Sequence, residues 1–195
     1  MTSTVTRASY LAVPLLMLAY GVLRLVDGID GVRGPGIAWT TGHLAFLAAL
    51  AGFIPIFLDM RRRIGGGAVA TTSAVAGFFG MACAAAQFVI DIVVGLAAAD
   101  HAAMSAMWIQ VKAVPGVDLL VYQGGPILFY AGLLALSIHL AVARKAAFWM
   151  PLLVLVQVAA PLVSLDYLPI GALFLLAAFV PLARTAPAAR HALAA

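Results

Sequence analysis

Residues 68–97 read AVATTSAVAGFFGMACAAAQFVIDIVVGLA, an apolar segment in which Asp91 is the only charged side chain. About 20 apolar residues in a helix cross the roughly 30 Å hydrocarbon core of a bilayer, so this segment predicts a transmembrane helix. The rest of the chain has the same character, since 65% of its 195 residues are hydrophobic and 9% are charged. That composition excludes a soluble domain, which needs a polar surface, and a disordered chain, which is poor in apolar residues. The sequence therefore predicts an all-α integral membrane protein.

Six apolar segments are long enough to be transmembrane helices. They cover residues 8–26, 37–58, 68–97, 125–142, 147–163 and 165–182. A single helix over the last two would be about 54 Å long, too long for one span, so we expect a tight turn near Ser164 and Asp166. Pro161 and Pro169 mark this break. We expect a six-transmembrane-helix bundle over residues 1–184 and a flexible cytoplasmic tail over residues 185–195.

The basic residues around these segments predict an orientation, because cytoplasmic loops of membrane proteins are enriched in Lys and Arg. With six spans, most of them fall on one side, which also holds both termini: Arg7, Arg61, Arg62, Arg63, Arg144, Lys145, Arg184 and Arg190. Six of the seven Asp residues lie on or near the opposite side. We therefore expect a protein of the cytoplasmic (inner) membrane with both termini cytoplasmic. The excess of Arg over Lys and the many Ala residues indicate a GC-rich bacterial genome.

Residues 100–114 predict a short helix on the outer side of the membrane. Its apolar residues recur at helical spacing on one face: Met104, Met107, Trp108 and Val111. Polar residues occupy the other face, as expected of a helix that lies in the membrane interface. Asp100 is a suitable N-cap, and the following Pro and Gly would end the helix. This segment is either a passive interfacial helix or a lid over a cavity.

Asp91 is the strongest candidate for a functional residue, because ionisable side chains within transmembrane segments are expensive to bury and often mark functional sites. Helical spacing places Asp91 and Gln87 on the same face as Gly80, Ala84 and Gly95. Small residues of this kind line contacts between membrane helices. We therefore expect Asp91 and Gln87 to face the interior of the bundle, near its outer boundary.

Further polar side chains on other predicted spans lie near the depth of Asp91: Arg24, His43, Tyr122 and Asp166. Two interpretations are open. One is an interfacial belt, since Tyr prefers the headgroup region and Arg side chains extend toward it. The other is an outward-opening polar pocket, in which Arg24 pairs with Asp91 and the remaining side chains orient a ligand. The sequence also leaves open whether Asp91 is a fixed anion or an acid that exchanges a proton.

Common catalytic and metal-binding patterns are absent from the sequence, including serine-hydrolase, zinc-protease and phosphate-loop motifs. The Asp-Gly alternation from Asp27 to Gly31 lacks the further ligands of a calcium loop. The single cysteine, Cys83, excludes a Cys-based metal site. His43 and His139 fall near opposite faces of the membrane, so they cannot share a haem iron. We expect no metal, no cofactor and no nucleic-acid partner, since the basic residues are explained by membrane orientation.

Three functions remain open. The first is binding or movement of a small molecule in an outward-facing polar pocket, with Arg24 and Asp91 as the charged contacts. The supporting ligand-binding side chains would be His43, Gln87, Tyr122 and Asp166. The second is a membrane-embedded enzyme on a lipid or isoprenoid substrate, with Asp91 as the catalytic acid. The third is an accessory subunit of a membrane complex.

The expected partners follow from these functions. They are the lipid bilayer and a small-molecule or lipid ligand. Six short helices leave little room for a complete transport path, so transport would favour a homo-oligomer or a partner subunit.

Overall fold

The computed structural model describes residues 3–185, which form helices and no strands. In chain order the elements are α1 (Ser3–Asp27), α2 (Ile37–Arg63), α3 (Ala68–Ala97), α4 (His101–Ala113), η1 (Val117–Gly124), α5 (Gly125–Val142), α6 (Met150–Val163), η2 (Leu165–Tyr167) and α7 (Leu168–Thr185). η1 is a π-helical segment that leads directly into α5, and η2 is a short 3-10 turn before α7.

Five helical stretches within the described range are long and apolar enough to cross a membrane: α1, α2, α3, η1 with α5, and η2 with α7. α6 is apolar too, but its 14 residues make a helix of only about 21 Å. The architecture is therefore consistent with a helical membrane bundle, while the predicted number of six spans stays a prediction.

The predicted helix positions agree closely with the structure. α3 and α5 have the predicted bounds, whereas α1 and α2 extend beyond the apolar residues that defined them. The fifth predicted helix begins later than expected, at Met150, because a turn bond from Met150 N–H to Ala147 O precedes it. The predicted turn after it is confirmed: Ser164 Oγ accepts a hydrogen bond from Asp166 N–H at 3.2 Å. Of the predicted tail, Thr185 ends α7, and residues 186–195 lie outside the described range.

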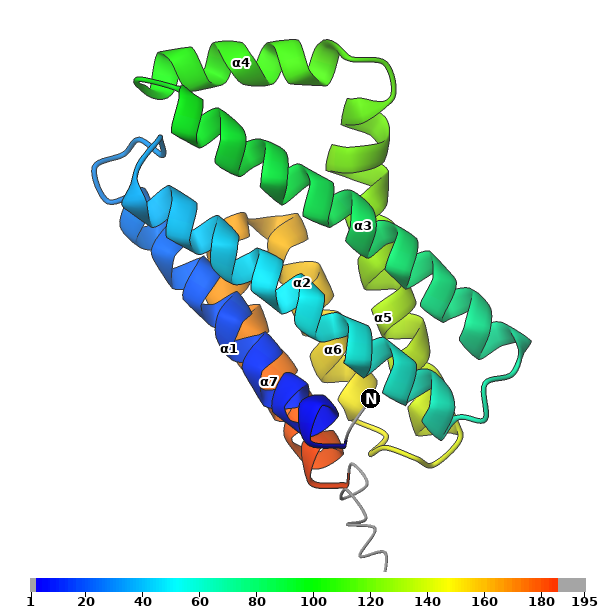
Figure 1. Cartoon of the computed structure of the whole chain (residues 1–195). Helices are drawn as coiled ribbons and strands as arrows, with labels where there is room; N and C mark the ends of the chain where they lie inside the picture. The colour runs from blue at the N-terminus through cyan, green and yellow to red at the C-terminus, as the bar shows by residue number, and fades with distance from the viewer. Residues whose placement is uncertain (1–2, 186–195) are drawn as a thin grey trace, which may run out of the picture.

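Figure 1 shows α1, α2, α3, α5 and α7 running along the bundle, with α4 lying across one end of it. We call this end the α4 end. The first residues of α1 and the last of α7 lie at the opposite end, which we call the terminal end (Figure 1). α1 packs against α2 and α7, and α3 packs against α2 and α5.

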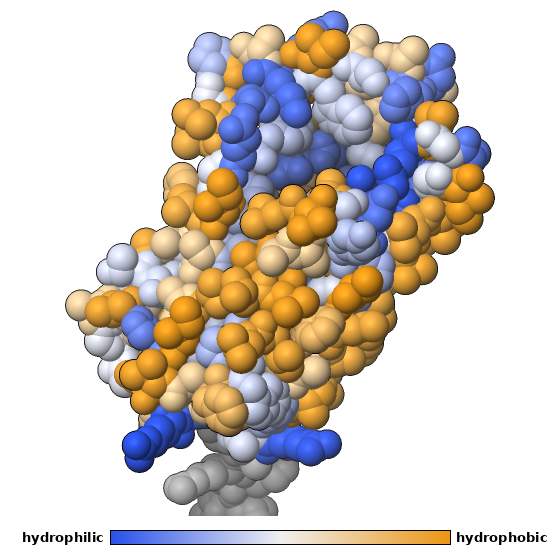
Figure 2. All heavy atoms as spheres, turned by 180° about the vertical axis from the view of Figure 1, so that it is seen from behind, coloured by the Kyte–Doolittle hydropathy of each residue, from blue (hydrophilic) through white to orange (hydrophobic). Residues whose placement is uncertain are grey.

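The surface of the molecule matches a membrane environment. Figure 2 shows a broad hydrophobic band between hydrophilic atoms at the α4 end and at the terminal end. Exposed apolar side chains include Val75, Phe79, Ile127 and Leu152, each more than half exposed. Soluble monomers rarely expose apolar patches of this extent, so the band fits contact with lipid.

Glycines allow α3 and α5 to pack at close range. A Cβ atom on Gly80 would lie 2.2 Å from the backbone N of Phe129. A Cβ atom on Gly132 would lie 2.6 Å from the backbone O of Ser73. Because backbone atoms cannot move aside cheaply, no larger residue fits at either position. This is the small-residue packing that is typical of membrane helices.

Polar contacts join three helices at the terminal end. Asp59 Oδ2 accepts hydrogen bonds from Tyr10 Oη at 2.9 Å and from Arg63 Nε at 2.6 Å. Arg63 also donates to Leu182 O and to Thr185 Oγ1. This network explains why Asp59 lies with the basic residues: its charge is paired within the bundle.

Candidate polar site at the α4 end

Asp91 lies at the centre of a hydrogen-bond network in which three other elements take part. Its side chain on α3 is buried, with 6% of the residue exposed. Asp91 Oδ1 accepts hydrogen bonds from Trp108 Nε1 of α4 and from Tyr122 Oη of η1, both at 3.0 Å. Trp39 Nε1 of α2 donates to the backbone O of Asp91 at 3.0 Å. Gln87 lies one turn earlier on α3, half-buried.

His43 on α2 lies between this network and a small cavity. Its Nδ1 is 2.7 Å from the backbone O of Trp39, one turn earlier on the same helix. Its Nε2 is 3.8 Å from Asp91 Oδ2. Aromatic rings surround the imidazole, with ring centroids of Trp39, Phe88 and Tyr20 at 4.0, 5.1 and 5.6 Å. His43 is therefore held in one orientation by packing and by a backbone hydrogen bond.

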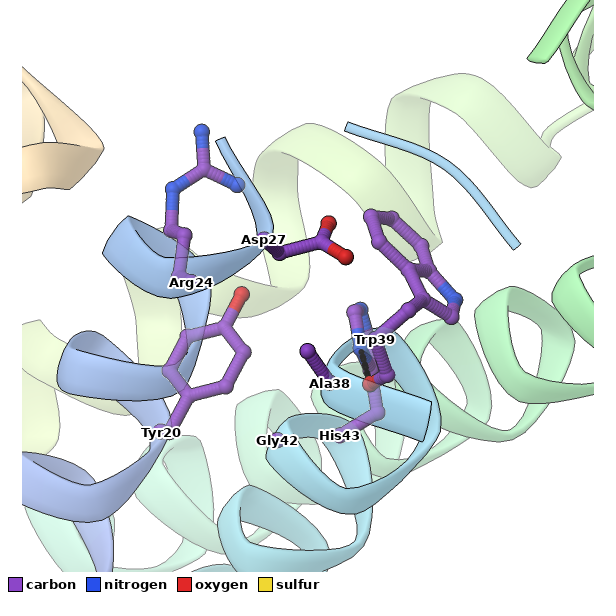
Figure 3. Close-up of a pocket in the computed structure, with 7 residues that line it drawn as sticks. All are labelled: Tyr20, Arg24, Asp27, Ala38, Trp39, Gly42 and His43. Carbon is purple, nitrogen blue, oxygen red and sulfur yellow. Dashed lines mark hydrogen bonds between the residues drawn. The ribbon is translucent and has the colours of Figure 1, made fainter. Parts of the chain in front are cut away.

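The cavity lies between α1 and α2 (Figure 3). Its lining residues are Tyr20, Arg24, Asp27, Ala38, Trp39, Gly42 and His43. Its volume of about 10 Å³ leaves room for about one water molecule. Among the described residues, Arg24 Nε and Asp27 Oδ2 are buried and have no hydrogen-bond partner. An acidic and a basic side chain thus line the same cavity with unsatisfied atoms.

Charged side chains adjoin the cavity and form a group that we call the charged cluster: Arg24, Asp27, Arg33 and Asp166. Arg33 Nη2 donates to Asp166 Oδ1 at 2.8 Å, and Arg24 Nε lies 3.5 Å from the same oxygen. Two arginines therefore converge on one carboxylate of η2. Figure 2 shows that the surface near the α4 end is hollowed and that hydrophilic atoms line the hollow.

The structure brings most of the predicted site residues to the α4 end, but it divides them into two groups. His43 and Tyr122 contact Asp91, and Arg24 contacts Asp166. The suggested ion pair of Arg24 with Asp91 is not formed in the part of the chain that the structure describes. Arg24 is on α1, which packs against α7 and η2, so the nearest carboxylate is that of Asp166.

Several residues of the site were not selected from the sequence: Tyr20, Asp27, Arg33, Trp39 and Trp108. Helical spacing offered a signal for three of them. Asp27 follows Arg24 by three residues, and Tyr20 precedes it by four, so all three share a helix face. Trp39 likewise precedes His43 by four residues. Trp108 was predicted on the apolar face of α4, and its indole N–H could have been considered as a hydrogen-bond donor.

No group of three or more His, Cys, Asp or Glu side chains suited to a metal ion occurs between residues 3 and 185. The side chains at the α4 end offer hydrogen-bond donors and acceptors and charged groups. No protein-family model matches the sequence, and searches of curated proteins and of solved structures give no significant match. The function therefore has to be argued from the site itself.

Proposed function

We propose that the chain is a six-span protein of the cytoplasmic membrane that binds a small polar molecule at its α4 end, which faces outward. The distribution of basic residues between the two ends of the bundle supports this orientation. The terminal end carries Arg7, the three arginines at the end of α2, and Lys145, as expected for the cytoplasmic side. The short α6 would cross as the sixth span with local thinning of the bilayer, which costs a fraction of a kcal/mol per Å of mismatch.

One observation carries the proposal of a ligand: Arg24 Nε and Asp27 Oδ2 line the same cavity, and within residues 3–185 both are buried without a hydrogen bond, Arg24 Nε having only its 3.5 Å ion-pair contact with Asp166. A buried polar atom that lacks a partner costs about 1–3 kcal/mol, and a charged one costs more. Proteins retain such a cost mainly where a ligand or water satisfies the atoms. A molecule with both hydrogen-bond donors and acceptors would satisfy both side chains.

The size of the cavity indicates how such a molecule would enter. A space for about one water molecule is too small for an organic ligand. The ion-pair contact of Arg24 with Asp166 is long, at 3.5 Å, and Asp166 is 42% exposed at its side chain. An entering acidic group could therefore replace Asp166 beside Arg24 at low cost, since exposed ion pairs contribute little. We expect the molecule to approach from the α4 end, where Figure 2 shows a hollow lined by hydrophilic residues.

Native mass spectrometry of the full chain, purified in mild detergent, tests this function. We expect a retained small molecule whose mass is lost in Arg24→Gln and in Asp27→Asn. Arg144→Gln is the matched control, because Arg144 is an exposed arginine in the turn after α5 and should leave retention unchanged. A bare chain, or a mass that all three variants retain, would contradict the proposal.

A further inference from the structure

The hydrogen bond of His43 determines which of its ring nitrogens carries a proton. Nδ1 lies 2.7 Å from the backbone O of Trp39, and a carbonyl oxygen can only accept a hydrogen bond. Nδ1 must therefore be the donor. In a neutral imidazole only one nitrogen carries a proton, so Nε2 is then an acceptor with a free lone pair.

This tautomer directs two acceptors at each other. His43 Nε2 lies 3.8 Å from Asp91 Oδ2, and the two side chains are 5% and 8% exposed. Trp108 and Tyr122 both donate to the other oxygen, Oδ1, so neither satisfies Oδ2 in this arrangement. A lone pair that faces a buried carboxylate oxygen is unfavourable, because two acceptors then approach each other. One additional proton between Nε2 and Oδ2 removes the conflict.

We propose that His43 and Asp91 together bind one exchangeable proton, which enters from the α4 end through the cavity that His43 lines. The proton is held either as imidazolium beside carboxylate or as imidazole beside carboxylic acid, two forms with the same number of protons. Release breaks the N–H or O–H bond, leaves imidazole and carboxylate, and passes the proton to solvent through the cavity. A closure of about 1 Å would bring the two atoms within hydrogen-bond distance.

The other titratable or charged side chains around the pair come from three elements. Tyr20, Arg24 and Asp27 of α1 line the same cavity as His43. Tyr122 of η1 contacts Asp91, and Lys112 Nζ of α4 lies 4.8 Å from the centre of the Tyr122 ring. Tyr, Arg and Lys side chains generally keep their protons at neutral pH, so the groups here that can exchange one are the His43–Asp91 pair and, on the path through the cavity, the carboxyl of Asp27.

Nuclear magnetic resonance of the full chain with isotope-labelled histidine tests the proposal without any ligand, so its outcome is independent of the proposed small-molecule function. The chain has four histidines, and the His43 signals are those lost in His43→Gln. We expect Nδ1 of His43 to carry a proton at every pH. We also expect Asp91→Asn to change the proton affinity of His43 at least about tenfold, as for strongly interacting sites. Asp118→Asn is the matched control and should change it little.

Two results would overturn the proposal. One is a wild-type spectrum in which Nε2 of His43 carries the only proton. The other is a His43 titration that Asp91→Asn leaves unchanged. If Asp91→Asn fails to fold, measurements on the wild-type protein alone still test the proposal. Infrared spectra of the wild-type protein across a pH series must then show one proton leaving the pair, from either a carboxylic acid or an imidazolium. Spectra in which neither group loses a proton would contradict the shared site.

Discussion

At the residue scale, Asp91 organises the α4 end because one carboxylate accepts bonds from two separate elements. The helical spacing of Asp91 with the small residues of α3 was enough to predict that its side chain faces the bundle interior. Its partners could not be predicted in the same way. Depth along a helix follows from the residue number, but the neighbour of a side chain depends on which helices pack together. Arg24 and Asp91 share a depth, yet Arg24 contacts η2 instead.

Replacement of Asp91 by Ala should destabilise the protein. It leaves Trp108 Nε1 and Tyr122 Oη without their acceptor, and each unsatisfied donor costs about 1–3 kcal/mol when buried. Because both groups are partly exposed, we expect a loss near the lower bound, about 2 kcal/mol in total. Tryptophan fluorescence during unfolding in mixed micelles measures this. Asp91→Asn keeps an acceptor oxygen and should lose less. Equal losses in the two variants would contradict the role of the acceptor.

At the element scale, α4 is a packed part of the site. Its predicted N-cap is confirmed by the bond from Ala103 N–H to Asp100 Oδ1 at 2.8 Å, and Met104 is fully buried against Trp39 and Val94. The helical spacing of apolar residues was sufficient to predict the helix and its apolar face, but not the packing of that face on Trp39 and Val94. The π-helical turns of η1 were missed, because no sequence period distinguishes them from an ordinary loop before the next helix.

Trp108 should hold α4 in place. We expect Trp108→Ala to speed amide hydrogen exchange across His101–Ala113, since both the bond to Asp91 and the contact with Trp39, at 5.4 Å between ring centroids, are lost. Exchange in α5 should stay unchanged. Ile109→Ala is the control, because Ile109 is 72% exposed on the other face of α4. Equal exchange in both variants would show that Trp108 does not anchor the helix.

The α3–α5 contact should tolerate no side chain at Gly80. An added Cβ atom would lie 2.2 Å from a backbone nitrogen of α5, so Gly80→Ala must push the two helices apart. Overpacking of this kind typically costs about 1–3 kcal/mol. Thermal unfolding in detergent measures the loss. Gly67→Ala is the matched control, since no atom lies within 4 Å of its added Cβ atom. A Gly80→Ala protein as stable as Gly67→Ala would show that the helices are not closely packed there.

At the scale of the whole molecule, the distribution of charged residues agrees with the arrangement of the helices. The two described chain ends share one end of the bundle (Figure 1), and the charged cluster and Asp91 belong to the α4 end. An even number of crossings is needed for this arrangement in a membrane, so α6 would have to count as a span despite its 14 residues. The sequence predicted the two charged ends because basic residues recur at alternate loops. It overestimated the length of α6, since Ala147 and Phe148 are apolar but belong to a turn.

Cysteine labelling of intact cells with a membrane-impermeant maleimide tests whether the polar site at the α4 end faces outward. Cys83 is first replaced by Ala, and single cysteines are then placed at Ile29, which is 81% exposed at the α4 end, and at Gly67, which is exposed at the terminal end. We expect Ile29→Cys to react in intact cells and Gly67→Cys to react only after the membrane is opened. Labelling of Gly67→Cys but not of Ile29→Cys in intact cells would contradict an outward-facing site.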